Sequence, residues 1–233
     1  NWSGSPEMPP VEFALTIGND LGRSGRFAVM EEADLPQHPV QFQEVNFRDW
    51  RLLGMENIVL GALKALPDGT FEVEFRLIDV YRGAQIAGFR IPATAKQVRR
   101  TAHRISDIIF ERLTGIRGAF DTRIAYVTVR NNNDGSKRYQ MQIADADAFN
   151  SQVLMESSEP LMSPAWSPDG RQLAYVSFES RNSSIFIQDI ITGERTRVAG
   201  FSGINSAPAW SPDGTRLAMT LSREGDPEIY IMH

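Results

Sequence analysis

Residues 163–170 read Ser-Pro-Ala-Trp-Ser-Pro-Asp-Gly, and residues 207–214 read Ala-Pro-Ala-Trp-Ser-Pro-Asp-Gly, an offset of 44. The copies stay in register downstream, where Leu-Ala at 173–174 recurs at 217–218 and the apolar triplet 185–187 recurs at 229–231. A third copy lies upstream, since Met141, Ile143 and Asp145 stand 44 positions before Ile185, Ile187 and Asp189. A period near 44 with several short strands per unit is typical of a β-propeller blade.

One repeat predicts four strands, at 164–167, 172–178, 184–189 and 195–199. The Ser-Pro-Asp-Gly between the first two has the residue preferences of a type I turn. Trp166 and Trp210 end the inner strands, where a large ring can wedge between blades. Residues 121–233 hold about 2.6 such repeats, and propellers close with typically about 4–8 blades. We therefore expect a piece of a longer chain, or a ring that another chain completes.

The first half predicts a mixed α/β domain. Its expected helices are 10–21, 47–53 with Asn46 as cap, and a last helix from a Thr94/Gln97 capping box to Gly115. Its expected strands are 26–30, 57–63, 71–77 and 85–91. We place the boundary at 115–120, which gives domains 1–119 and 120–233. Four basic residues share one side of the last helix, which is read as a solvated face or as a basic docking face: Lys96, Arg99, Arg100 and Arg104.

Composition excludes several classes of function. The chain has no cysteine, so no disulfide framework, thiolate zinc site or Cys nucleophile exists. Its three histidines, His38, His103 and His233, lie far apart, and we expect no metal and no cofactor, with His103 an ordinary surface or boundary residue. The net charge of -5 argues against nucleic acid as a binding partner. No apolar run is long enough to span a membrane, so we expect no direct membrane insertion. The chain starts at Asn1 without a signal peptide, as a processed product would.

Three stretches resemble the TolB family of the Tol-Pal envelope system of Gram-negative bacteria. They are 113–127, which joins that family's N-terminal domain to its propeller, 160–170 in the next blade, and 20–27. The resemblance implies an α/β N-terminal domain before a six-bladed propeller, here incomplete and lacking its first strand. It also implies a non-enzymatic periplasmic scaffold, which serves envelope integrity and cell division. Such proteins bind the lipoprotein Pal through the propeller and TolA through the N-terminus, a segment largely missing here.

The expected Pal-binding residues lie in the two loops that lead into inner strands, 157–163 and 200–207. These loops mix apolar and polar groups, as protein interfaces do; the candidates are Leu161, Met162, Ile204, Asn205 and Ser206. Leu161 is equally compatible with a core position at the start of a strand. The alternative function is the propeller and accessory domain of a prolyl-peptidase-like α/β-hydrolase whose catalytic domain lies outside this sequence. Neither 22–26 nor 200–204 fits the G-x-S-x-G nucleophile elbow of that class.

Overall fold

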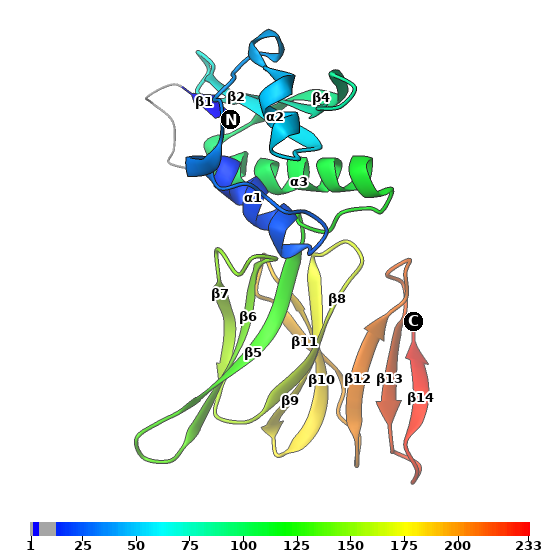
Figure 1. Cartoon of the computed structure of the whole chain (residues 1–233). Coiled ribbons are helices and arrows are strands. Elements are labelled where there is room, and N and C mark those ends of the chain that lie inside the picture. Colours follow the sequence, from blue (N-terminus) through cyan, green and yellow to red (C-terminus); the bar gives the residue numbers. More distant parts are fainter. Residues whose placement is uncertain (1, 5–12) are drawn as a thin grey trace. The chain divides into compact units, whose positions relative to one another are not determined.

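A computed structural model describes residues 2–4 and 13–233 of the chain. The chain forms two compact units, the first ending at Thr122 and the second running from Arg123 to His233 (Figure 1). Helices and one sheet make up the first unit, and antiparallel sheets alone make up the second. This is the predicted fold class.

The first unit is built on a four-stranded sheet of order β1-β2-β3-β4. Its strands are β1 (Trp2–Gly4), β2 (Asn57–Ala65), β3 (Phe71–Asp79) and β4 (Ala84–Ala93). The last three form the predicted antiparallel meander. β1 pairs with β2 in parallel, through Trp2 opposite Gly61 and Gly4 opposite Leu63. The sequence analysis did not predict this strand, because a three-residue edge strand carries too little periodicity to be seen in the sequence.

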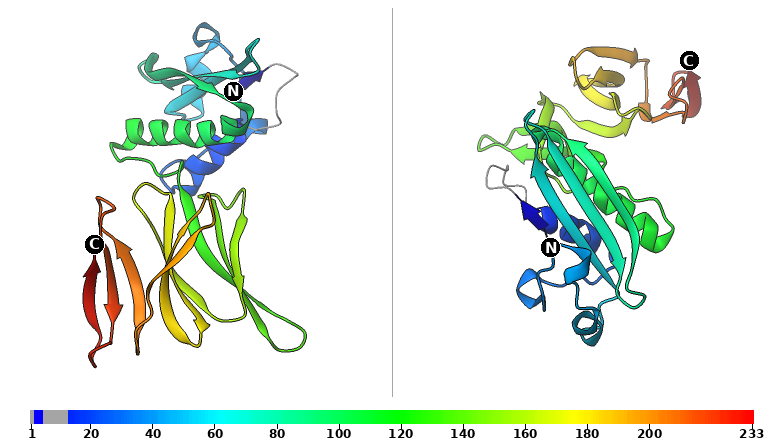
Figure 2. Two further views of the ribbon diagram at one scale, coloured as in Figure 1. Left: turned by 180° about the vertical axis from the view of Figure 1, so that it is seen from behind. Right: turned by 90° about the horizontal axis from the view of Figure 1, so that it is seen from above.

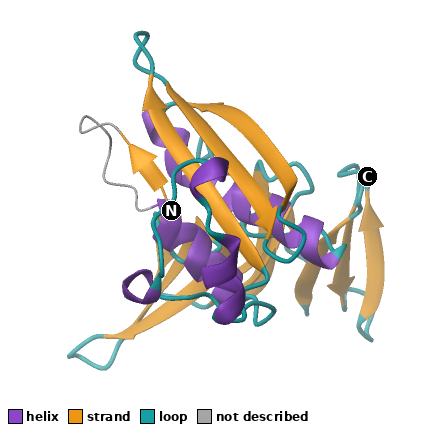
Figure 3. Ribbon diagram, turned by 45° about the horizontal axis from the view of Figure 1, so that its top comes forward, coloured by secondary structure: helices purple, strands orange, loops and turns teal. Residues whose placement is uncertain are grey.

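Helices pack on both faces of this sheet (Figure 3). On one face, α1 (Phe13–Arg23) and α3 (Val98–Thr114) bury an apolar core against Val73 and Phe75 of β3. On the other face, α2 (Phe47–Leu52) covers one end of the sheet with Trp50. Three short 3-10 turns complete the unit: Glu32–Asp34, Phe42–Glu44 and Ala95–Gln97.

The segment after α1 differs from the prediction. No strand forms at 26–30, and α1 runs past Leu21 to Arg23. The predicted start of this helix, at 10–12, lies outside the described residues. Gly18 and Gly22 sit inside the helix and face Val29, whose methyl groups would lie 3.4 and 3.8 Å from a Cβ at those glycines. Val29 thus packs on the helix surface instead of pairing in a sheet.

The helix α3 keeps its predicted ends. Thr94 and Gln97 form the capping box, on the 3-10 turn that precedes the helix, and Gly115 ends it with a left-handed φ of 73°. The prediction that His103 is a surface or boundary residue is wrong, because its side chain is buried. Its Nδ1 lies 2.7 Å from Oδ2 of buried Asp20 in α1. The pair joins the two helices that cover the sheet.

The second unit consists of three successive antiparallel sheets, seen side by side in Figure 2. The first blade holds β5 (Arg123–Asn131), β6 (Lys137–Asp145) and β7 (Gln152–Ser157). The second holds β8 (Leu161–Trp166), β9 (Gln172–Ser180), β10 (Asn182–Asp189) and β11 (Arg195–Ala199). The third holds β12 (Asn205–Trp210), β13 (Leu217–Leu221) and β14 (Glu228–Met232). The four strands predicted from one repeat form in the second blade, where β8 begins three residues and β10 two residues earlier than expected and β9 runs on to Ser180.

Apolar side chains fill the space between neighbouring blades. Met141 of the first blade packs with Leu161, Leu173 and Tyr175 of the second. Leu217, Met219 and Leu221 of the third blade pack with Ala174, Val176 and Ile185 of the second. The expected role of the tryptophans is confirmed for Trp210, whose indole N–H donates to the carbonyl of Ala165 in the preceding blade at 3.2 Å. The blades therefore share cores and have none of their own.

Each Ser-Pro-Asp-Gly turn holds itself together. The Gly170 N–H donates to the Ser167 carbonyl at 2.8 Å, and Gly170 takes a left-handed φ of 67°. Asp169 accepts from the Ser167 hydroxyl at 2.5 Å and from the Arg171 N–H at 3.0 Å. These hydrogen bonds hold the pKa of Asp169 below its usual range. Asp213 in the second copy accepts from Ser211 and Thr215, and its pKa is lowered for the same reason.

Candidate functional site

The structure separates the five predicted Pal-binding residues into two groups. Met162 and Ile204 are exposed, with 41% and 46% of their surface accessible, and Ser206 is half-buried. Leu161 and Asn205 are buried, at 3% and 0%. Four of the five also lie in strands, β8 and β12, and not in loops as expected. Only Met162, Ile204 and in part Ser206 are placed where a partner can touch them.

Leu161 and Asn205 occupy the same position of two successive repeats, 44 residues apart. Both start an inner strand, opposite Ser177 and Leu221 respectively. Leu161 fills this position with apolar packing against the neighbouring blade. Asn205 fills it with hydrogen bonds, accepting from the Phe201 N–H at 3.0 Å and donating to the Phe201 and Gly203 carbonyls at 2.8 and 3.3 Å. Asn205 thus shapes the loop in front of it, and its side chain is buried.

The loop that Asn205 shapes presents two apolar side chains to solvent. Phe201 is 42% exposed and Ile204 is 46% exposed. The Ile204 N–H donates to the Ser222 hydroxyl at 2.7 Å. The Phe201 ring lies beside the guanidinium of Arg223, 5.0 Å from its centroid. We call Phe201, Ile204 and Met162 the inner-strand surface. Sequence reasoning missed Phe201, although an aromatic residue between Gly200 and Gly203 was a usable signal.

A repeated β-bulge lies beside this surface in the second and third blades. The register of β8 on β9 shifts between Met162 and Ala165, and that of β12 on β13 shifts between Ser206 and Ala209. Ser163 and Ala207 take left-handed φ values of 53° and 50°, each just before a proline. Such a conformation is unfavourable for residues other than glycine, so the surrounding blade must hold it in place. The bulges redirect the inner strands at the position of the candidate residues.

The residues that the structure describes include no group of three or more His, Asp or Glu side chains arranged to hold a metal ion. Among the same residues, no helix combines the length and the apolar character that crossing a bilayer requires.

Comparisons with known proteins assign a family to both units. Residues 110–233 match the TolB beta propeller domain, and residues 1–86 match the TolB amino-terminal domain. The chain belongs to the TolB family. It is 50% identical over 205 residues to the Tol-Pal system protein TolB of Thioalkalivibrio sulfidiphilus and 51% identical over 199 residues to that of Nitrosococcus oceani. These alignments cover 88% and 85% of this chain and 47% and 46% of the relatives.

A crystal structure of TolB from Acinetobacter baumannii has the same fold. It superposes with a TM-score of 0.86 at 38% identity, over 99% of this chain and 57% of that one. The chain thus spans about half the length of the TolB relatives it matches. This agrees with the three blades seen here, since the predicted ring needs more.

Proposed function

We propose that this chain is part of a non-enzymatic periplasmic scaffold of the Tol-Pal system. In this proposal the propeller binds the lipoprotein Pal, and the N-terminal segment binds TolA. Membership in the TolB family across both units supports a role in the Tol-Pal system, because the curated relatives of this chain are named Tol-Pal system proteins. The partners and the compartment come from the resemblance set out above.

The observation that carries Pal binding is the exposed apolar pair on a fixed loop. Phe201 and Ile204 are exposed, yet their backbone is held by hydrogen bonds to Asn205 and Ser222. A loop fixed before binding loses little conformational entropy when a partner arrives. Large apolar side chains in such a setting are the usual anchors of protein interfaces. The inner-strand surface is therefore our Pal site, and Leu161 and Asn205 support it from behind.

The site is tested by calorimetric titration of purified Pal into the full-length protein that contains this chain. We expect Ile204→Asp, Phe201→Ala and Met162→Ala each to weaken binding by about 1–3 kcal/mol where the residue is an anchor. The matched control is Ile191→Asp, since Ile191 is 78% exposed on the hairpin that leads into the outer strand β11. Wild-type affinity in all three variants would place the Pal site elsewhere.

The hydrolase alternative has less support. It rests on the Trp-Ser-Pro-Asp-Gly turns, and the structure uses both turns to connect strands within a blade. The match of residues 1–86 to the TolB amino-terminal domain favours the scaffold, because the alternative treats the first half only as an accessory domain without a family of its own. Assaying the full-length protein with a chromogenic peptide ester would test the alternative directly. Turnover that a serine-directed inhibitor abolishes would contradict the scaffold proposal.

A further inference from the structure

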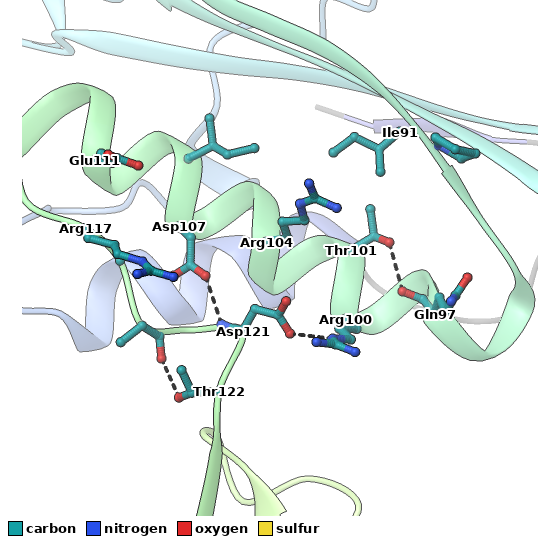
Figure 4. A pocket seen from close by; sticks show the side chains of 14 residues that line it. Ile91, Gln97, Arg100, Thr101, Arg104, Asp107, Glu111, Arg117, Asp121 and Thr122 are labelled. Atoms are coloured by element: carbon teal, nitrogen blue, oxygen red, sulfur yellow. Dashed lines mark hydrogen bonds and ion pairs between the residues drawn. The ribbon is translucent and has the colours of Figure 1, made fainter. Parts of the chain in front are cut away.

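The first unit contains a pocket of about 820 Å³ between the end of β4, the face of α3 and residues 117–122. Its charged side chains cancel, since three arginines stand against three acids: Arg100, Arg104 and Arg117 against Asp107, Glu111 and Asp121. Figure 4 shows that Asp121 pairs with Arg100, at 2.8 Å, and donates its N–H to Asp107, at 3.1 Å. The charge of the pocket therefore favours no class of ligand. A more specific arrangement lies in the third blade.

The turn between β13 and β14 holds the loop of the inner-strand surface in place. The Ser222 hydroxyl accepts the Ile204 N–H at 2.7 Å, and the Ser222 N–H donates to the Ile204 carbonyl at 3.1 Å. A Cβ on Gly203 would collide with the Ser222 hydroxyl, so the turn and the loop lie in direct contact. The backbone of Arg223, the next residue of the turn, is thereby held beside the exposed anchors Phe201 and Ile204.

The guanidinium of Arg223 contacts two aromatic rings. Its central carbon lies 5.0 Å from the centre of the Phe201 ring and 5.5 Å from that of the Tyr230 ring. Both distances are within the roughly 6 Å at which a cation is attracted to the face of a ring. Nε also lies 3.4 Å from Oε1 of Glu224, but both side chains of this ion pair are exposed, so it stabilises the arrangement little. The two rings are therefore the main contacts that orient Arg223.

The two rings differ in how they are held. Tyr230 packs against the apolar cluster between the second and third blades. Phe201 belongs to none of the apolar clusters that the described residues form, and 42% of its surface is exposed. Asn205 hydrogen-bonds to the main chain of Phe201 and not to its ring. Arg223 thus connects an exposed ring to a ring that is packed on the core.

We propose that Arg223 is a positioning residue of the inner-strand surface, which holds the Phe201 ring in the orientation that receives a partner. The inference rests on the Pal-binding proposal, because it concerns the same surface. A side chain that is free to change rotamer must be ordered on binding, and this ordering lowers affinity. A planar guanidinium can stack on both rings, whereas the ammonium of lysine is a compact charge on a flexible stem. We therefore expect arginine, and not lysine, to support full affinity at this position.

The test is a double-mutant cycle, measured by calorimetric titration of purified Pal into the full-length protein that contains this chain. We expect Arg223→Met to weaken binding about threefold to tenfold, and Arg223→Lys to weaken it less. In the Phe201→Ala background, Arg223→Met should add less than about twofold, because the ring through which Arg223 acts is absent. The matched control is Arg216→Met, on an exposed arginine just before the other end of β13, which should change affinity less than about twofold.

A second measurement follows the contact without Pal. In the full-length protein with isotope-labelled arginine, Phe201→Leu should move the side-chain resonances of Arg223, because a neighbouring ring shifts them through its ring current. Ile191→Asp, on an exposed side chain of the second blade, should leave them unchanged. Resonances that do not move in Phe201→Leu would show that the contact is absent in solution and would overturn the inference.

The outcomes separate this inference from the Pal-binding proposal. Wild-type affinity in Arg223→Met, while Phe201→Ala weakens binding, would overturn the positioning role and leave the Pal site standing. An equal loss from Arg223→Met in both backgrounds would make Arg223 a direct contact of Pal, and this also overturns the positioning role. Wild-type affinity in Phe201→Ala alone would overturn the inference, whereas wild-type affinity in Phe201→Ala, Met162→Ala and Ile204→Asp together would overturn both proposals.

Discussion

Trp210 donates its indole N–H to the carbonyl oxygen of Ala165 in the preceding blade, at 3.2 Å. Trp166, one repeat earlier, places the same ring against the same kind of core, but within the described residues its buried indole N–H has no partner. The two tryptophans of the repeat thus differ in one hydrogen bond.

We expect Trp210→Phe to lower the free energy of unfolding by about 1 kcal/mol more than Trp166→Phe does. The first substitution removes a hydrogen bond and leaves the Ala165 carbonyl without its donor. The second removes a donor that is already unsatisfied, and Phe keeps a ring face for the Arg123 guanidinium, which lies 4.9 Å from the Trp166 ring. Urea unfolding followed by circular dichroism measures both, and equal losses would contradict the role assigned to the bond.

Removing His103 should destabilise the first unit. His103 and Asp20 are both buried, and His103→Leu removes the hydrogen bond between them. The buried Asp20 carboxylate then keeps its ion pair with the partly exposed Arg23, at 3.2 Å. Breaking a buried polar pair from one side costs about 3 kcal/mol. The control is His38→Leu, on an exposed side chain, which should stay within about 0.5 kcal/mol. Asp20→Asn in the His103→Leu background should recover part of the loss, since it removes the buried charge.

Two glycine substitutions should have opposite effects. A Cβ on Gly118 would lie 2.6 Å from the Cα of Asp107, so Gly118→Ala must move the backbone of 117–122 or of α3 and should cost about 1–3 kcal/mol. Gly22→Ala, inside α1, has its nearest contact at 3.8 Å and should gain up to about 1 kcal/mol from helix propensity. Thermal unfolding of the helical signal measures both. A stabilising Gly118→Ala would mean that the segment is not fixed against Asp107.

Acid should destabilise the blades in a defined window of pH. Asp189 accepts hydrogen bonds from the Thr192 and Ile191 N–H groups and pairs with Arg171, which lowers its pKa to about 2. An unfolded aspartate titrates near about pH 3.9. Between these values the unfolded chain binds more protons, so stability is present above about pH 4 and is lost as pH falls towards about 2. Denaturation curves measured across this range should show that the free energy of unfolding falls less steeply with decreasing pH in Asp189→Asn than in wild type.

The sequence predicts the propeller better than it predicts the surface of the propeller. Strands of the second unit follow from a repeat that is visible in the chain, and β11 forms with the expected bounds. The burial of Leu161 does not follow, because it depends on contacts with the neighbouring blade. The burial of Asn205 does not follow either, since it depends on how the loop 201–203 folds back on its side chain. The same holds for His103, which is polar in sequence but is buried by a partner 83 residues away. The sequence pattern therefore does not predict burial that depends on the three-dimensional course of the chain.

The Ser-Pro-Asp-Gly turns have a consequence for how such a protein grows during evolution. The hydrogen bonds that close the Ser167–Gly170 turn are made within residues 167–172, so a duplicated gene segment would carry these bonds with it. The bond between Trp210 and Ala165 joins two copies, and it can arise only after duplication has placed one copy beside another. A blade can therefore be duplicated together with the hydrogen bonds of its own turn. The contacts between blades form afterwards, and they can differ from one pair of neighbouring blades to the next.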